Sequence, residues 1–209
     1  MTKRPYDIEE REREILGHPP RVLPLDSQDV IAAALENTGR LRQAASGGSA
    51  PVSMSEIPEL VVTLLRHPHL YQRLTDMAVQ LQGRGALAPR DRELAVLRVG
   101  WLCQAPYEWG EHVRLAKQAG LTSDEIERVT HGSSAPGWTE HEAATLRAAE
   151  ELHETAMISD ATWRSLSESL DERQLIELPI LIGQFTLVAY LQNALRLRLG
   201  HANIGLRAR

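Results

Sequence analysis

The chain contains a single cysteine, Cys103, among its 209 residues. One cysteine cannot form an intrachain disulfide or a cysteine-rich metal site, which suits a reducing compartment. A chain of this length fits one domain of ordinary size and can bury a hydrophobic core without such supports. We therefore expect a soluble, cytoplasmic protein.

Signals for export and for nucleic-acid binding are also lacking. Residues 1–16 are dense in charged side chains and have no apolar core, so we expect neither a signal peptide nor a membrane anchor there. The arginines outnumber the lysines but are interleaved with acidic residues and form no basic stripe. Nucleic acid is therefore not expected as a partner.

Patterns that hold metal ions and nucleotides are missing as well. His67 and His69 bracket Pro68, but no third ligand follows at a metal-binding spacing. The glycines form no phosphate-binding pattern beside a strand. The sequence therefore predicts no metal ion and no cofactor.

Apolar residues at helical spacing are what the sequence does have. From Ser55 onward they recur without any run of alternating β-branched residues, which predicts an all-α domain over residues 52–209. Residues 1–51 begin with a charged segment, are broken at Pro19-Pro20, and end in a Gly/Ser linker after a short helical stretch at 29–44. We interpret them as an N-terminal arm that is loosely ordered or crosses to a neighbouring subunit.

Capping and breaking residues set the expected helix boundaries. Helices are predicted over residues 55–66, 69–82, 89–103 and 106–119, with a longest helix over 171–199 that Pro179 kinks. Capping boxes, in which two residues three apart bond each other's backbone N–H, are predicted for Thr122 with Glu125, Thr139 with Glu142, and Asp171 with Gln174. In the helix at 69–82, the predicted apolar face is formed by Leu70, Leu74, Met77 and Leu81.

The stretch at 175–191 is apolar enough to raise the question of a membrane span. It contains Glu177, Pro179 and Gln184 within ~17 residues, so we interpret it as a buried core helix and expect no membrane association. Its long apolar face exceeds what a monomer of this size would cover, which predicts a homo-oligomer.

Three titratable residues are predicted to meet between two neighbouring helices. Glu93 shares a helix face with Val96 and Leu97, and Glu108 and His112 are four residues apart and stack on one face. Burial raises the pKa of a carboxylic acid and lowers that of a histidine, while a nearby carboxylate raises the histidine pKa again. Such a trio can hold a shared proton near neutral pH, although a Glu and a His at this spacing are also common as solvated neighbours.

The segment around these residues resembles a known family. The runs RDREL at 90–94, YEW at 107–109, and AGL at 119–121, together with His112, are similar to the central signature of the carboxymuconolactone decarboxylase-like family. The resemblance covers residues 55–130, and residues 139–198 are similar to the C-terminal part of its longer members. It implies an all-helical, AhpD-like fold, assembly into trimers or hexamers, and an active site beside the helix that carries the histidine.

The resemblance also separates two branches of the family. In the hydroperoxide-reducing branch, a Cys-x-x-Cys pair occupies the positions of Ala105 and Glu108 in this chain. Both thiols are replaced here, and Cys103 alone cannot make the internal disulfide of a peroxidase cycle. The decarboxylase-like branch, which uses no thiol or metal, is the closer match.

We therefore interpret the chain as a cofactor-free lyase or isomerase acting on a small, conjugated, carboxylated lactone or dienoate from aromatic-compound breakdown. His112 is predicted to donate or accept the proton, Glu108 to orient or charge the imidazole, and Glu93 to act as a second acid or fix the histidine tautomer. A carboxylate on the substrate would be bound by an arginine, and the candidates are Arg92, Arg98 and Arg114.

Two other functions stay open from the sequence. One is a thiol-dependent peroxidase or reductase that uses Cys103, and the other is a non-catalytic, oligomeric small-molecule-binding or scaffold protein. An offset of 81 residues also aligns Glu93 with Gln174 and His112 with Asn193, which suggests an internal repeat of a helix pair whose second copy cannot react.

Overall fold

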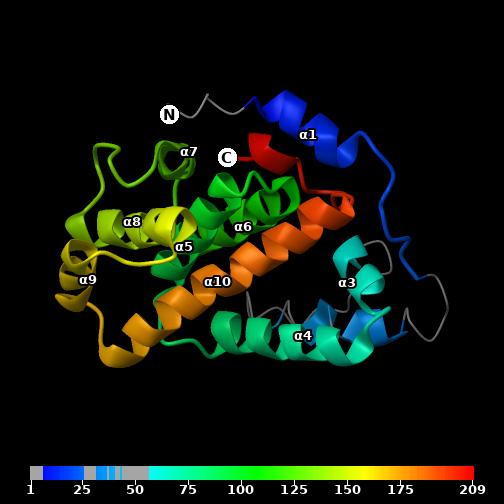
Figure 1. Cartoon of the computed structure of the whole chain (residues 1–209), viewed down its shortest axis with the longest axis horizontal. Coiled ribbons are helices and arrows are strands. Elements are labelled where there is room, and N and C mark those ends of the chain that lie inside the picture. The colour runs from blue at the N-terminus through cyan, green and yellow to red at the C-terminus, as the bar shows by residue number, and fades with distance from the viewer. Residues whose placement is uncertain (1–6, 26–31, 37, 41–42, 44–56) are drawn as a thin grey trace.

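The computed structural model describes residues 7–25, 32–36, 38–40, 43 and 57–209. Within these ranges the chain is helical and has no strand, which confirms the all-α prediction (Figure 1). Near the N-terminus lie α1 (Ile8–Leu16) and the helical residues 32–36 and 38–40. The remaining elements are α3 (Glu59–Leu64), α4 (Pro68–Gly83), α5 (Pro89–Leu102), α6 (Pro106–Gln118), α7 (Ser123–His131), α8 (Glu140–Thr155), α9 (Asp160–Ser167), α10 (Glu172–Leu195) and the short 3₁₀ helix η2 (Gly205–Arg207).

Side-chain caps start three helices where the sequence predicts them. Capping boxes at Thr122, Thr139 and Asp171 begin α7, α8 and α10. Each box satisfies backbone N–H groups that the first turn of a helix leaves free. Helix α9 was not predicted; the hydroxyl of Ser159 caps it by accepting from the backbone N–H of Thr162. The predicted cap at Ser55 lies outside the described residues.

Helix α5 is the centre of the fold. It packs against α6, α7, α8 and α10, and every residue from Arg92 to Gly100 is buried. One hydrophobic cluster, shared with α8, α9 and α10, contains Ala95, Val96 and Val99, and a second, shared with α6 and α7, contains Leu94 and Leu97. Because partners cover α5 on all sides, Glu93 is buried whichever face of the helix it occupies.

Helix α10 crosses the front of the molecule and is buried on one face only (Figure 1). Leu178, Leu181, Ile182 and Phe185 face the core, whereas Ile176, Ile180, Leu187 and Tyr190 on the opposite face are exposed. The prediction of a buried core helix is therefore correct for one face of the helix only. The helix also ends at Leu195, four residues before the predicted end, because Arg196 adopts a left-handed conformation.

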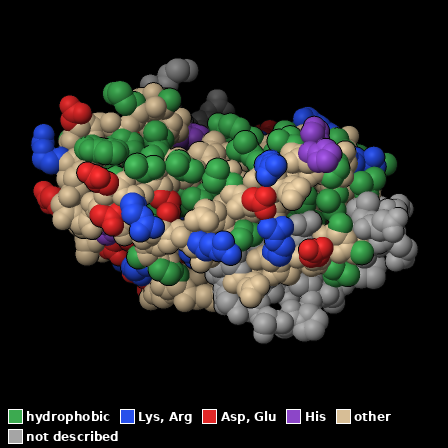
Figure 2. Space-filling model, turned by 90° about the horizontal axis from the view of Figure 1, so that it is seen from below, with side chains coloured by type: hydrophobic (Ala, Val, Ile, Leu, Met, Phe, Trp, Pro, Cys, Tyr) green, Lys and Arg blue, Asp and Glu red, His purple; other side chains and the backbone are tan. Residues whose placement is uncertain are grey.

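Among the described residues, α10 is the helix whose length and apolar composition would allow it to cross a membrane. Core helices of soluble proteins share these properties, so they are weak evidence for a membrane span. A view from below shows hydrophobic side chains gathered in a band beside many charged ones (Figure 2).

The predicted apolar face of α4 is wrong in part. Leu70 and Met77 are largely exposed, and Tyr71, Thr75 and Leu81 are the buried residues of this helix. The helix is rotated because Tyr71 packs with Val61 of α3 and Ala34 in a small hydrophobic cluster that involves the N-terminal region.

The described N-terminal helix packs on its own chain. Ile8 packs against the second hydrophobic cluster, and the carboxylate of Glu12 accepts from the backbone N–H of Leu206 at 2.9 Å. The guanidinium of Arg11 donates to the carbonyl of Gln104 at 3.2 Å. For α1, the expectation of a loosely ordered arm is therefore wrong, and exchange of the arm with a neighbouring subunit stays a prediction. Residues 1–6, 26–31, 37, 41–42 and 44–51 of the arm lie outside the described residues.

The internal repeat of a helix pair is also wrong. Gln174 and Asn193 lie on the same continuous helix, α10, separated along its axis by about 28 Å at ~1.5 Å per residue. The first pair is divided by the break at Ala105-Pro106, and the aligned positions, Thr186 and Leu187, continue a helix. Without a break the chain cannot fold back, so the two amides cannot meet.

Candidate active site

The turn between α5 and α6 brings the three predicted residues together. Gln104 has a positive φ of 48°, Ala105 is extended, and Pro106 occupies the first turn of α6, so the chain reverses direction within a few residues. The helices approach closely at Gly100, where a Cβ atom would lie 3.4 Å from the backbone nitrogen of Trp109. This close packing places Glu93 of α5 opposite His112 of α6.

Glu93 is held by charges on both of its oxygens. Its Oε2 lies 2.7 Å from Nδ1 of His112, and its Oε1 accepts from Nε of Arg92 at 2.9 Å. Burial opposes ionisation, but His112 and Arg92 outweigh it and lower the pKa of Glu93 below its ordinary value. Glu93 is therefore an ionised acceptor, which leaves the proton of a neutral imidazole on Nδ1 and a lone pair on Nε2.

The other nitrogen of His112 faces a second carboxylate. Nε2 lies 3.5 Å from Oε1 of Glu108, too long for a strong hydrogen bond. The edge of the ring packs against Phe185 of α10, with 4.8 Å between ring centroids. The imidazole is thus fixed on one side by Glu93 and on its flank by an aromatic ring.

The pKa values of the two carboxylates are shifted in opposite directions: that of Glu93 is lowered and that of Glu108 is raised. Burial raises the pKa of Glu108, and this effect is larger than the lowering by His112 and by the Gln192 amide. The resulting pKa is about 7. Despite its burial, His112 has a raised pKa because Glu93, and then Glu108, favour the imidazolium. Environments that separate the pKa values of neighbouring groups are typical of acid–base sites.

Glu108 and His112 line a cavity of about 220 Å³ between α4, α6 and α10. Leu60, Ala78, Leu115, Phe185 and Val188 form its apolar wall, and Gln192 of α10 lies beside Glu108. The amide Nε2 of Gln192 donates to Oε2 of Glu108 at 3.0 Å. The three residues predicted from the sequence therefore converge, with two of them at a cavity and Glu93 behind the histidine.

The three candidate arginines have different environments. Arg92 is bound to Glu93 and to the carbonyl of Gln82, and Arg98 is paired with Glu150 at 2.8 Å. Both guanidinium groups are therefore engaged inside the protein. Arg114 is exposed and lines the cavity, so it is the candidate that can meet a carboxylate of a bound compound.

Cys103 is a poor nucleophile in this structure. It follows the last residue of α5 and is not among the residues that line the cavity. Burial, and then the nearby carboxylate of Glu108, raise the pKa of its thiol to about 11. Because the thiolate is the reactive form, this environment argues against the thiol-dependent alternative.

Sequence reasoning missed Phe185 and Gln192. They are seven residues apart on α10 and therefore lie on the same face of the helix. This spacing was the one signal in the sequence that the two side chains could contribute to the same site. Which neighbour that face meets is not encoded locally. Glu108 and Gln192 are 84 residues apart in the chain.

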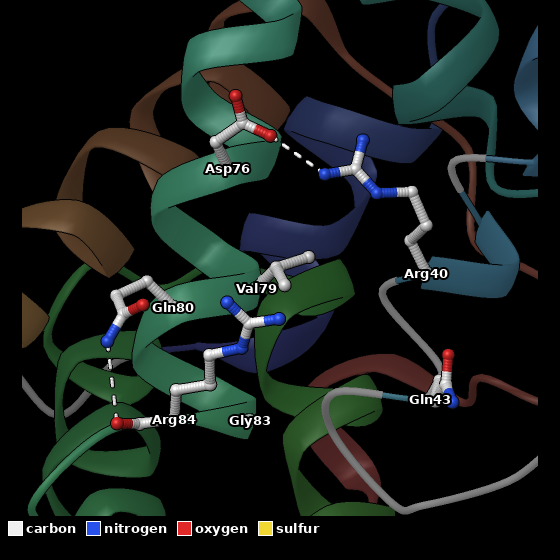
Figure 3. A pocket seen from close by; sticks show the side chains of 7 residues that line it. All are labelled: Arg40, Gln43, Asp76, Val79, Gln80, Gly83 and Arg84. Atoms are coloured by element: carbon white, nitrogen blue, oxygen red, sulfur yellow. Dashed lines mark hydrogen bonds and ion pairs between the residues drawn. The ribbon is translucent and has the colours of Figure 1, made fainter.

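A larger hollow, of about 600 Å³, lies away from these residues, beside the C-terminal half of α4 (Figure 3). Arg40 and Asp76 form an ion pair at 2.8 Å on its wall, and Gln80 donates to the carbonyl of Arg84. Size alone does not select this hollow, because the buried acid–base groups lie at the smaller cavity.

Across the described ranges, no three His, Cys, Asp or Glu side chains are grouped so that they could hold a metal ion.

Comparison with known proteins agrees with the resemblance. Residues 68–151, which include all three predicted site residues, match the model of the Carboxymuconolactone decarboxylase family. No curated protein sequence matches the chain.

Solved structures extend the likeness beyond that segment. The debrominase Bmp8 in complex with 2,3,4-tribromopyrrole is 16% identical, with a TM-score of 0.71 over 88% of this chain and 94% of that chain. An AhpD-core, peroxidase-related protein from Ralstonia eutropha JMP134 is 16% identical, with a TM-score of 0.69 and the same coverage. A peroxidase-related protein from a Silicibacter species is 15% identical, with a TM-score of 0.70 over 88% of this chain and 95% of that chain. At these identities the likeness shows the fold alone: the chain has an AhpD-like helical fold, and its residues 68–151 match the model of the carboxymuconolactone decarboxylase family.

Proposed function

We propose that this protein is a cofactor-free lyase or isomerase that moves a proton on a small, conjugated, carboxylated compound such as a lactone or dienoate. The observation that carries the proposal is the imidazole of His112, bound at Nδ1 by Glu93 and opposed at Nε2 by Glu108 at the wall of a cavity. A histidine oriented at one nitrogen and accessible at the other is suited to general acid–base catalysis.

The two glutamates have different roles in this proposal. Glu93 stays ionised, fixes the imidazole and stabilises the imidazolium when His112 takes up a proton. Glu108, with a pKa of about 7, is able to accept or release a proton at neutral pH. The pair formed by His112 Nε2 and Glu108 Oε1 therefore exchanges the proton with the substrate.

In both reactions the His112–Glu108 pair supplies or removes every proton that is transferred to or from carbon. In a decarboxylation, the C–C bond to the carboxylate breaks, CO₂ leaves, and the electron pair moves into the conjugated carbonyl before carbon is protonated by the His112–Glu108 pair. In an isomerisation, the same pair removes a proton from one carbon and returns it to another. Arg114 at the cavity supports binding of a substrate carboxylate.

The test is a panel of ring-cleavage lactones and dienoates, incubated with the protein while CO₂ release and ultraviolet absorbance are followed together. CO₂ release together with an absorbance change identifies a lyase, and an absorbance change alone identifies an isomerase. Tight binding of a carboxylated compound without either signal would overturn the proposal in favour of a binding protein. Consumption of hydroperoxide that disappears in Cys103→Ser would overturn it in favour of a thiol peroxidase.

A further inference from the structure

Three residues that line the cavity each have a buried side-chain oxygen with no hydrogen-bond partner within the described structure. These oxygens are Oε1 of Glu108, Oε1 of Gln192 and Oγ1 of Thr38. Their residues are 3%, 2% and 7% exposed, so all three oxygens are buried beside the cavity. Buried polar atoms in proteins nearly always have a partner, and three without one at a single cavity indicate groups that a ligand satisfies.

The Glu108–Gln192 bond determines which atoms stay free. An ionised carboxylate can only accept, so the amide of Gln192 must present its Nε2 to Glu108. The amide oxygen cannot take that place, and it is left without a donor. Glu108 and Gln192 therefore hold each other in an orientation that leaves two unpaired acceptors beside the cavity.

The size and apolar wall of the cavity limit what can bind. Its volume of about 220 Å³ exceeds the ~150 Å³ of an apolar cavity that holds benzene. Phe185, Leu115 and Val188 suit the face of one flat ring. Arg114 provides a cation for a carboxylate.

We infer that the wall formed by Gln192, Glu108 and Thr38 recognises a hydrogen-bond donor, an O–H or N–H group, on a single-ring carboxylated ligand. The inference rests on the proposed function for the place of the site, and it adds which substituent the substrate carries. Binding of a ring without the donor would leave the buried acceptors unpaired, and this cost is the strongest basis on which a site discriminates against an analogue that lacks the donor.

Binding of matched ligands tests this inference without any turnover. We expect the full chain, titrated by calorimetry at pH 8, to bind 3- or 4-hydroxybenzoate about tenfold more tightly than benzoate or the corresponding methoxybenzoate. At this pH Glu108 is largely ionised, because its pKa is about 7. Equal affinity for the hydroxy and unsubstituted compounds, or no binding of any of them, would overturn the inference.

Variants assign the preference to the wall. Gln192→Met keeps the length of the side chain but removes the acceptor, and should reduce the preference to within about twofold. Thr38→Val should reduce it partly. Thr63→Val is the matched control, because Thr63 is also buried and has an unpartnered hydroxyl but does not line the cavity, so the preference should be unchanged.

The readouts keep the two proposals separate. Circular dichroism establishes whether each variant is folded. If Gln192→Met does not fold, the comparison of Thr38→Val with Thr63→Val tests whether the wall carries the preference. A full hydroxyl preference in both Gln192→Met and Thr38→Val would contradict the assignment of the wall. If the wild-type protein shows no hydroxyl preference but has His112-dependent turnover, only this inference is overturned. If the wild-type protein shows the preference but no turnover of any substrate, only the proposed function is overturned.

Discussion

Nδ1 of His112 lies 2.7 Å from Oε2 of Glu93, a residue nineteen positions earlier and on the preceding helix. The sequence spacing favours Glu108 as the residue that orients the imidazole, because residues four apart are neighbours on a helix. Glu108 is instead 3.5 Å from the other nitrogen and shares a hydrogen bond with Gln192. Glu93 therefore positions the histidine, and Glu108 is left to exchange protons at the cavity.

Replacing His112 by alanine should remove the group that moves the proton. We expect turnover of the substrate found in the panel to fall by about 10² to 10⁴-fold. His131→Ala is the matched control: His131 also follows a glutamate, Glu127, by four residues, but it is exposed and 3.7 Å from that carboxylate. Steady-state kinetics should show no change for His131→Ala, and full activity in His112→Ala would end the acid–base proposal.

Glu108→Gln should shift the pH dependence of turnover. The carboxylate of Glu108 is one cause of the raised pKa of His112, so removing its charge lowers that pKa. The imidazolium is then lost at a lower pH, and the basic limb of the pH–rate profile moves downward as turnover falls. Profiles measured from pH 5 to 9 for both proteins check this, and an unshifted basic limb with full turnover would contradict the role of Glu108.

Glu93→Gln should destabilise the fold as well as slow turnover. It leaves the buried guanidinium of Arg92 without its counter-charge, which typically costs about 3 to 5 kcal/mol. The pKa of Glu93 is lowered in the folded state, so its contribution is present above the ordinary value of 4.5 and is lost as the pH falls through the folded value. Urea unfolding should therefore show a large cost at pH 7 that shrinks in acid.

Glu150→Gln is the control for that measurement. Glu150 is paired with Arg98, but its side chain is 25% exposed, whereas that of Glu93 is fully buried. After the substitution, the Arg98 guanidinium also keeps its hydrogen bonds to the carbonyls of Val129 and Thr130. We expect a smaller loss of unfolding free energy than for Glu93→Gln. Equal losses would show that burial of the pair does not set the cost.

Cys103→Ser should leave turnover nearly unchanged. Its thiol has a pKa of about 11, so little thiolate exists at neutral pH and alkylation should be slow. The measurement is the rate of iodoacetamide modification of the wild type at pH 7 and 9, together with the activity of the variant. Fast alkylation at pH 7 accompanied by loss of activity would restore the thiol-dependent alternative.

The exposed apolar face of α10 predicts self-association. Ile176 is 63% exposed and Tyr190 is 60% exposed, on the face opposite the core. We expect sedimentation at micromolar concentration to give a species larger than the 23.3 kDa monomer, with three copies or a multiple of three. Ile176→Glu should weaken the assembly, and Met157→Glu, at a residue 67% exposed outside α10, should not. A wild-type monomer would contradict this prediction.

Local interactions allowed the sequence to determine the helices and part of the site. Prolines at the first turns of α4, α5 and α6, and capping boxes at Thr122, Thr139 and Asp171, act over three or four residues, so their spacing is enough to place helix starts. For the same reason, Glu108 and His112 were predictable as neighbours.

Contacts between distant residues were decided by the tertiary structure alone. Packing of α5 against α6 bonds Glu93 to His112, packing of α10 places Phe185 and Gln192 at the cavity, and ion pairs engage Arg92 and Arg98 but leave Arg114 at the cavity. The same packing leaves one apolar face of α10 exposed, with Ile176, Ile180, Leu187 and Tyr190 on it. A helix's own sequence sets its propensity and its faces, but which neighbour covers each face depends on segments far away along the chain, as for Glu108 and Gln192, which are 84 residues apart.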